Sequence, residues 1–407
     1  MRGMAAAAGV LAVGLAPIGV QDPVSAQTLS ERVTMLEEKV DEGHAQAEDA
    51  LGIQFNALVS TTYNYSINNP DGGRDIGMRI YNRDHNSIDL RDAVLAVSRM
   101  KEDETFGFAL VMDFGRTAVQ GNGTDYGFLN DNGDRVFDIR EAYLTYKTPI
   151  PLPWSDGQVS IKGGKFVTLL GWEVLLDPIA GGYNDNVSMS LLSGFSIPFT
   201  HTGLLFNLPF SELFDLTIGV VNGLDNVKDN NDSKTLMAGL GSAPLDNLEF
   251  YVAGTYGAED VSIADGGLGA GSKTGILTAN MFLQATDMLA FVLDGTYASV
   301  SGVPIGGGRK GANWYGMGAY ALVSVTDALQ LTMRAEWFDD PDGIKTGLVN
   351  GATLWEITPT VTYWFNDHLM WRVEYRHDES SKPLFPADNG QTWRGQDVFS
   401  TEFLVTL

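Results

Sequence analysis

The sequence predicts an all-β protein, a transmembrane antiparallel up-and-down β-barrel of about sixteen strands that follows a short N-terminal coiled-coil helix. Three observations support this prediction. From Gly52 onward, polar and apolar residues alternate with the period of two that is typical of a strand with two different faces. A unit of two long strands then recurs about every 40 residues, and short turns alternate strictly with long loops. A soluble β-sandwich is not expected to show such an alternation of loop lengths.

Residues 1–26 have the features of a secretory signal. One basic residue, Arg2, precedes an apolar stretch, and three small residues that end at Ala26 form a cleavage site. A membrane anchor is the alternative, but Gly14 and Pro17 interrupt the stretch well before the roughly 20 residues that a spanning helix needs. We therefore expect export and cleavage near Ala26.

Residues 27–51 differ from everything that follows. They carry apolar residues at the 4-3-4 spacing of a coiled-coil seam, namely Leu29, Val33, Leu36 and Val40. A helix of about three heptads is too short to be stable alone, so we expect it to pack on copies of itself, on the barrel or on a partner. A surface helix that merely precedes the barrel is the alternative.

Residues 52–407 are expected to form the barrel. Four C-terminal hairpins repeat one pattern, in which a polar turn around an aspartate starts an apolar face that ends in Tyr or Trp. The aspartates are Asp246, Asp287, Asp327 and Asp367, and the aromatic residues are Tyr256, Tyr297, Trp337 and Tyr375. An amphipathic ring belongs at the headgroup level, so these residues predict an aromatic girdle. The predicted strands are 52–66, 86–99, 104–116, 135–148, 157–168, 197–207, 212–222, 233–242, 246–257, 273–285, 287–300, 311–324, 327–339, 351–365, 367–379 and 395–407.

The face opposite the aromatic girdle is charged. A Lys or Arg at the bilayer midplane costs about 2–4 kcal/mol, so this face should point to water. A ring of this size cannot fill its interior with side chains and should leave an aqueous lumen. The predicted pore-lining residues are Glu249, Asp294, Arg334, Glu336, Arg372, Glu374 and Arg376. For each of them, a structural charge that pairs across the wall is the alternative.

The connection 169–196 is long and more apolar than the other long loops. Its apolar residues need a surface to pack against, so we expect it to fold into the lumen and narrow it. The predicted constriction combines three acids of this loop with two lysines of the wall, namely Glu173, Asp177, Asp185, Lys162 and Lys165. Carboxylates at a narrow point favour cations. A loop that covers the rim or makes a subunit contact is the alternative.

The sequence offers no catalytic or metal-binding constellation. It contains no cysteine, and its 5 histidines stand in no His-Glu-x-x-His frame and near no Gly-x-Ser-x-Gly motif. His201, at the start of a strand, is expected to be a structural hydrogen-bonding residue. The net charge of −25 argues against a nucleic-acid partner. We therefore expect no enzyme activity and no cofactor.

Several segments resemble the OmpL-like β-barrel porins, namely 136–147, 161–173, 183–209 and the C-terminal hairpins. The resemblance covers most of 52–407. It implies a porin in a Gram-negative outer membrane, in contact with membrane lipid and lipopolysaccharide, and a homotrimer. The coiled coil is also similar to that of phosphate-selective porins. Those porins use basic residues in the channel, whereas this chain is acidic.

Two functions of different classes are compatible with these observations. The first is passive diffusion of small solutes and ions, with a preference for cations, through a channel that the 169–196 loop narrows. The second is a structural or scaffold barrel that tethers the envelope through residues 27–51 or sheaths a partner protein. An outer-membrane hydrolase is a third candidate, but the sequence shows no nucleophile–base pair that would support it.

Overall fold

The computed structural model describes residues 52–71, 75–100, 104–120, 128–129, 135–151, 157–176, 178–179, 182–211, 213–259, 272–305 and 308–406. The predicted signal and coiled coil lie outside these ranges, and so does Asp177. Among the described residues, no helix is long and apolar enough to cross a membrane.

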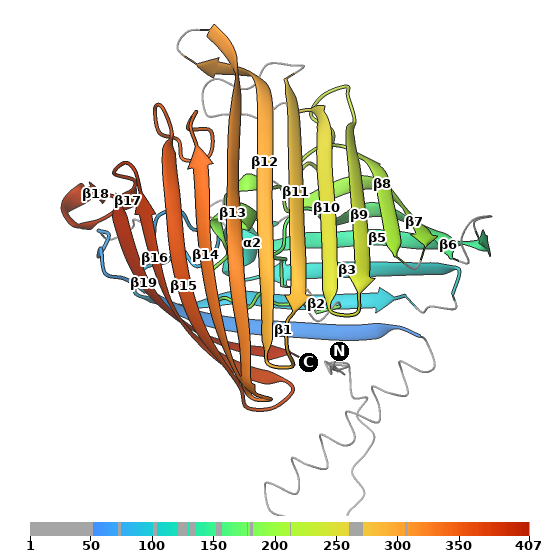
Figure 1. The fold of residues 1–407 in the computed structure, drawn as a ribbon, viewed down its shortest axis with the longest axis horizontal. Coiled ribbons are helices and arrows are strands. Elements are labelled where there is room, and N and C mark those ends of the chain that lie inside the picture. Colours follow the sequence, from blue (N-terminus) through green and yellow to red (C-terminus); the bar gives the residue numbers. More distant parts are fainter. Residues whose placement is uncertain are drawn as a thin grey trace, which may run out of the picture.

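A closed antiparallel barrel forms the molecule (Figure 1). Its sheet holds 17 strands, of which the two-residue β4 (Phe128–Leu129) is a small addition to β5, so the wall has sixteen. The wall strands are β1 (Gln54–Ser66), β2 (Ser87–Arg99), β3 (Phe106–Phe114), β5 (Arg135–Pro151), β6 (Gln158–Val167), β7 (Thr200–Ser211), β8 (Phe214–Val221), β9 (Thr235–Leu245), β10 (Leu248–Ala258), β11 (Lys273–Gln284), β12 (Leu289–Ile305), β13 (Gly308–Thr326), β14 (Leu329–Asp340), β15 (Ala352–Trp364), β16 (Leu369–Ser380) and β19 (Gly395–Thr406).

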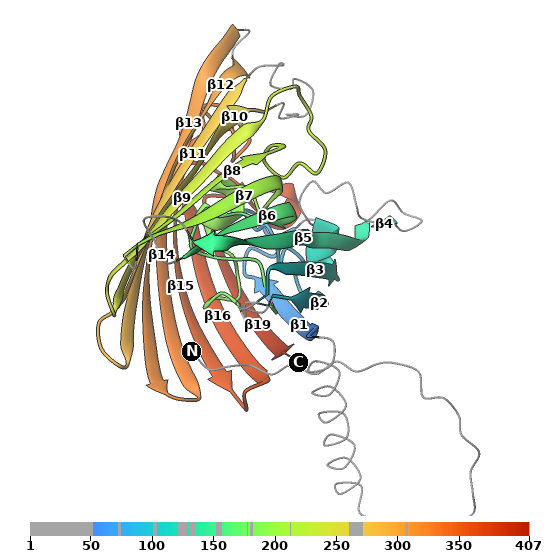
Figure 2. The same ribbon diagram turned by 90° about the vertical axis from the view of Figure 1, so that its right-hand side faces the viewer.

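The first and last wall strands close the ring. β1 pairs with β19 from Leu58 opposite Thr406 to Ser66 opposite Val398, so neither strand presents a free edge that would promote aggregation (Figure 2). Each of the sixteen predicted strand ranges overlaps one wall strand, which confirms the predicted barrel. The hairpin of β12 and β13 extends beyond its predicted ends and rises above its neighbours (Figure 1).

Some short elements were not predicted. They are β17 (Phe385–Pro386), β18 (Thr392–Trp393), helix α2 (Arg116–Gln120), a π-helical turn (Leu192–Ser196) and a 3-10 turn (Asp388–Gly390).

The predicted sorting of side chains between the two faces is observed. In β14, Met333 and Trp337 are exposed on the outer face, whereas Arg334 is fully buried on the inner face. Aromatic rings follow one another around the outside, because Tyr315 lies 6.3 Å from Tyr297 and 5.7 Å from Trp337 between ring centroids. This row matches the predicted aromatic girdle.

The loop between β6 and β7, residues 169–196, lies inside the barrel, and we call it the lumen loop. β6 and β7 stand half the ring away from β14 and β15, yet the loop contacts both of those strands. Its Leu192 belongs to a buried apolar cluster with Trp314 and Phe338 of the wall. Gly316 leaves room for this contact, since an added Cβ there would lie 2.6 Å from Leu192 Cδ2. The apolar content of the loop thus correctly predicted its position.

Candidate functional site: a loop anchored across the lumen

The base of the lumen loop is fixed at the start of β7. His201 is fully buried, and its Nδ1 and Nε2 lie 2.9 Å from Gly223 O and 3.0 Å from Thr168 Oγ1. Thr168 N also donates to Phe199 O at 2.8 Å, which joins the two ends of the loop. Both ring nitrogens therefore have structural partners, as the sequence predicted for His201.

Two glutamates of the wall bind backbone N–H groups of the lumen loop. Glu374 of β16 accepts hydrogen bonds from Val187 N at 2.7 Å and Ser188 N at 3.1 Å. Glu336 of β14 accepts one from Leu191 N at 2.6 Å. A buried backbone donor costs free energy when it has no partner, and an irregular loop has no neighbouring strand to supply one. The two carboxylates supply the missing acceptors.

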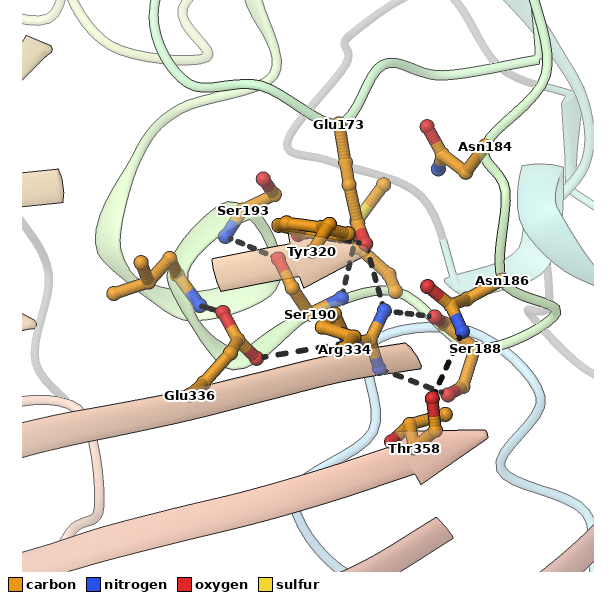
Figure 3. Close-up of polar contacts among 12 residues, drawn as sticks. Glu173, Asn184, Asn186, Ser188, Ser190, Ser193, Tyr320, Arg334, Glu336 and Thr358 are labelled. Atoms are coloured by element: carbon orange, nitrogen blue, oxygen red, sulfur yellow. Dashed lines mark hydrogen bonds and ion pairs between the residues drawn. The ribbon is translucent and has the colours of Figure 1, made fainter. Parts of the chain in front are cut away.

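Arginines of the wall bind backbone carbonyl groups of the same segment. Arg334 Nη1 donates to Ser188 O at 2.7 Å, and Arg376 Nη1 donates to Met189 O at 2.8 Å. Arg91 of β2 donates to Val187 O at 2.9 Å from another part of the ring. Arg372 donates to the carbonyl groups of residues 184 and 186. Side chains from several strands thus hold the loop backbone, and Figure 3 shows the part around Arg334.

Glu173 is the charged residue that the loop itself contributes to this contact. Its Oε1 lies 2.6 Å from Arg334 Nη1 and accepts a hydrogen bond from Tyr320 OH at 3.1 Å (Figure 3). Its Oε2 accepts a hydrogen bond from Ser190 N at 2.6 Å. Arg334 also donates to Glu356 Oε1 at 2.8 Å. The Arg334 guanidinium therefore joins two carboxylates and the loop backbone in a buried site.

The two lysines predicted to face the loop acids have other partners. Lys165 Nζ donates to Ile139 O at 2.6 Å and lies 3.6 Å from Asp138 Oδ1. Lys162 Nζ lies 4.4 Å from the centroid of the Tyr143 ring.

Of the loop acids, Glu173 pairs with Arg334, and the half-buried Asp185 accepts a hydrogen bond from Gln330 Nε2 at 2.8 Å. The expectation that these two acids face Lys162 and Lys165 is corrected, because the loop crosses to the opposite wall and both acids find their partners on β14. Asp177 lies outside the described residues. A role of these residues in selectivity stays a prediction.

The seven predicted pore-lining residues all belong to the inner face, but most of them do not meet water. Asp294 and the five charged residues of β14 and β16 are between 0 and 4% exposed, and they are Asp294, Arg334, Glu336, Arg372, Glu374 and Arg376. Glu249 of β10 is exposed. For the five on β14 and β16, the prediction of a water-exposed lining is corrected, because the lumen loop covers them and uses their charges as anchors.

The anchor residues also pair with one another around the wall. Arg91 Nη1 lies 2.8 Å from Glu402 Oε1, and Arg372 pairs with the same carboxylate. Arg376 Nη2 lies 2.6 Å from Asp378 Oδ1. Several residues that hold the loop or its anchors were not predicted, namely Arg91, Arg140, Glu356 and Glu402, of which Arg140 donates a hydrogen bond to Leu176 O of the loop. Each of the four is a charged residue within a predicted strand that has at least one apolar neighbour in the chain, namely Leu90, Ile139, Trp355 or Phe403.

A part of the lumen near the short turns is hollow. The volume of this cavity is about 400 Å³. Its lining residues include Asp215 of β8, Glu249 and Tyr251 of β10, Asn280 of β11 and Trp172 of the loop. Asp215 and Glu249 are both exposed and belong to the inner face of their strands. Two carboxylates therefore meet water on this part of the inner surface. Among the described residues, no group of three or more His, Asp or Glu could hold a metal ion.

Comparison with known proteins identifies a family. Residues 52–407 match the family model described as "Putative beta-barrel porin-2, OmpL-like". Comparison with curated proteins finds no match.

Solved structures of outer-membrane proteins share the fold. The outer membrane channel DcaP of Acinetobacter baumannii superposes with a TM-score of 0.59 at 11% identity, over 87% of this chain and 97% of that chain. Vibrio cholerae OmpT in its trimer form gives 0.57 at 12% identity, over 87% and 99% of the two chains. Pseudomonas putida OprB gives 0.57 at 11% identity, over 90% and 97%. At these identities the likeness shows the porin-like barrel fold alone.

Proposed function

Because the chain belongs to the OmpL-like β-barrel porin family, we propose that it is an outer-membrane channel for passive diffusion of small solutes and ions, with a preference for cations. The lumen loop narrows the channel. Filtering is steric and electrostatic, and it needs no covalent chemistry. One observation carries the proposal, namely that the lumen has two different parts. In one part the lumen loop covers the wall charges, which pair with one another and with the loop. The other part is hollow and carries carboxylates that are exposed to water.

The proposed cation preference rests on carboxylates that remain exposed to water. Asp215 and Glu249 are exposed on the inner face at the hollow part of the lumen. One exposed aspartate stands in each of four successive short turns, namely Asp246, Asp287, Asp327 and Asp367. Acids around a mouth raise the local concentration of cations and lower that of anions. Glu173 contributes less than the sequence suggested, because Arg334 neutralises it.

Reversal potentials in planar bilayers under a KCl gradient test this proposal. Interactions between exposed charges are worth up to about 1 kcal/mol. We therefore expect the double variant Asp215→Asn/Glu249→Gln to lower the cation-to-anion permeability ratio by up to about fivefold. The matched control is Asp232→Asn, which removes an exposed charge from the loop between β8 and β9. No conductance, or firm anion preference, contradicts the proposed function. An unchanged ratio in the double variant removes only these two acids from the explanation.

We propose that the channel is a homotrimer in contact with outer-membrane lipid and lipopolysaccharide. The likeness to OmpT in its trimer form and the exposed aromatic girdle support this assignment. Analytical ultracentrifugation of the purified protein in detergent measures the oligomeric state, and a monomer at all concentrations would exclude the trimer.

A structural barrel is the second candidate function, and one observation favours it. The side chains of Arg334, Arg372 and Arg376 are at most 1% exposed, so this part of the lumen is packed rather than open. Deletion of residues 27–51 tests the proposed tethering. Loss of envelope attachment with intact conductance would assign that task to the deleted segment, whereas a wild-type barrel without conductance would favour the structural function as a whole.

A further inference from the structure

A second cavity lies at the long-loop end of the lumen, away from the acidic hollow. Its volume is about 200 Å³, and its walls are largely apolar. Ile276, Val300 and Trp314 line it from the barrel, Ile197 from the segment that leads into β7, and Leu224 from the loop between β8 and β9. An apolar cavity of about 150 Å³ is large enough for benzene. This cavity can therefore hold the side chain of a small metabolite.

One cation faces this cavity. Lys345, in the loop between β14 and β15, places its Nζ 4.4 Å from the centroid of the Trp314 ring. The ammonium makes no ion pair within the described part of the chain. Burial lowers the pKa of Lys345 to about 8, and the nearby carboxylates Asp225 and Asp340 partly oppose this shift. The lysine is thus charged at neutral pH and available to an anionic group.

One anion faces the same cavity. Asp225 Oδ1 accepts hydrogen bonds from Phe199 N at 2.8 Å and Thr200 N at 2.9 Å. Among the described residues, its Oδ2 has no hydrogen-bond partner. Burial raises the pKa of Asp225, while the two backbone N–H groups and the charge of Lys345 lower it. Asp225 and Lys345 attract each other through space, yet no direct ion pair joins them.

We propose that this cavity binds an α-amino acid with an aliphatic side chain, such as leucine. Lys345 holds the α-carboxylate, Asp225 holds the α-ammonium through Oδ2, and the side chain fills the apolar part of the cavity. A purely apolar ligand would remove both charges from water without compensation, and a ligand with one charge would leave the other without a partner. A zwitterion with an apolar body satisfies both charges and the walls. This inference goes beyond passive diffusion, since a site of this kind saturates.

Isothermal titration calorimetry on the purified full chain in detergent tests the proposal. The probes are L-leucine, glycine, 4-methylpentanoate and 3-methylbutylamine, which separate the apolar body and the two charges. We expect L-leucine to bind at least tenfold more tightly than each of the other three. Equal binding of 4-methylpentanoate would identify an anion site, and equal binding of 3-methylbutylamine a cation site, and either result overturns the proposal. Absence of leucine binding overturns it as well.

Two variants assign the charges. Lys345→Gln and Asp225→Asn are each expected to weaken leucine binding at least tenfold. The asparagine retains a side-chain oxygen for Phe199 N and Thr200 N, so the base of the lumen loop keeps its acceptor. Lys310→Gln is the matched control, because Lys310 is an exposed lysine on β13. Should Asp225→Asn fail to fold, Lys345→Gln decides alone, and wild-type affinity in that variant refutes the site.

Discussion

Replacement of Arg334 by methionine should release the lumen loop from the wall. Arg334 donates three hydrogen bonds to the loop, and the two shortest are to Glu173 at 2.6 Å and Ser188 O at 2.7 Å. A hydrogen bond that involves a charged group contributes about 1.5–3 kcal/mol, so these two contacts give at least about 3 kcal/mol. The loss shifts the equilibrium between the anchored and the released loop about 150-fold toward release. Glu356 also keeps a buried charge with fewer partners, which adds to the effect.

Cysteine labelling measures this shift directly, because the chain contains no cysteine. Ser190→Cys places one thiol in the loop at a position that is 1% exposed in the anchored state. Its reaction with a maleimide should be slow in the parent and about 100-fold faster in the Arg334→Met background, since labelling follows the population of the open form. Single-channel recordings should show a changed conductance in the same variant.

The control for this experiment is Arg394→Met, which removes the same charge from an exposed site in the loop before β19. Labelling of Ser190→Cys should stay slow in that background. Equal labelling rates and equal conductance in Arg334→Met and the parent would refute the reasoning, because the arginine would then not hold the loop. A difference in electrophoretic mobility between heated and unheated samples verifies that each variant still forms the barrel.

Three further predictions address other parts of the molecule. His201→Leu removes both hydrogen bonds at the loop base and should lower stability by about 1–3 kcal/mol, measured by urea unfolding. Gly164→Ala should cost a similar amount, because φ is +138° there and an added Cβ would lie 2.2 Å from Ala142 O, whereas Gly295→Ala, with no contact under 3.8 Å, should be nearly neutral. Leucine binding should weaken about fourfold between pH 7 and pH 8.5, because Lys345, with a pKa of about 8, loses its proton over this interval, and pH-independent affinity would speak against its role.

The wall could be predicted from the sequence because a strand between lipid and water has a strict period of two. In β16, Trp371 and Val373 are exposed outside while Arg372 and Glu374 are buried inside, as the alternation requires. The position of the lumen loop could be predicted as well, since leucines in a long loop need a surface.

The partners of the loop could not be predicted. Which strand faces Glu173 depends on how sixteen strands close into a ring, and the spacing along the chain does not contain that information. The sequence suggested the lysines of β6, which are close in the chain, whereas the actual partner, Arg334, is 161 residues away. The cavity at Lys345 also combines six separate segments, so no local motif could reveal it.

The charged inner wall has a physical explanation that differs from pore lining. An irregular segment buried inside a barrel has backbone donors and acceptors that no strand satisfies. Carboxylates can accept only and guanidinium groups can donate only, so a wall with both can serve every group of such a segment. Glu374 and Glu336 serve the N–H groups of the lumen loop, while Arg334 and Arg376 serve its carbonyl groups. Because these charges are already paired, the proposed ion selectivity requires charges that still face water, and this is the reason to test Asp215 and Glu249 before any anchor residue.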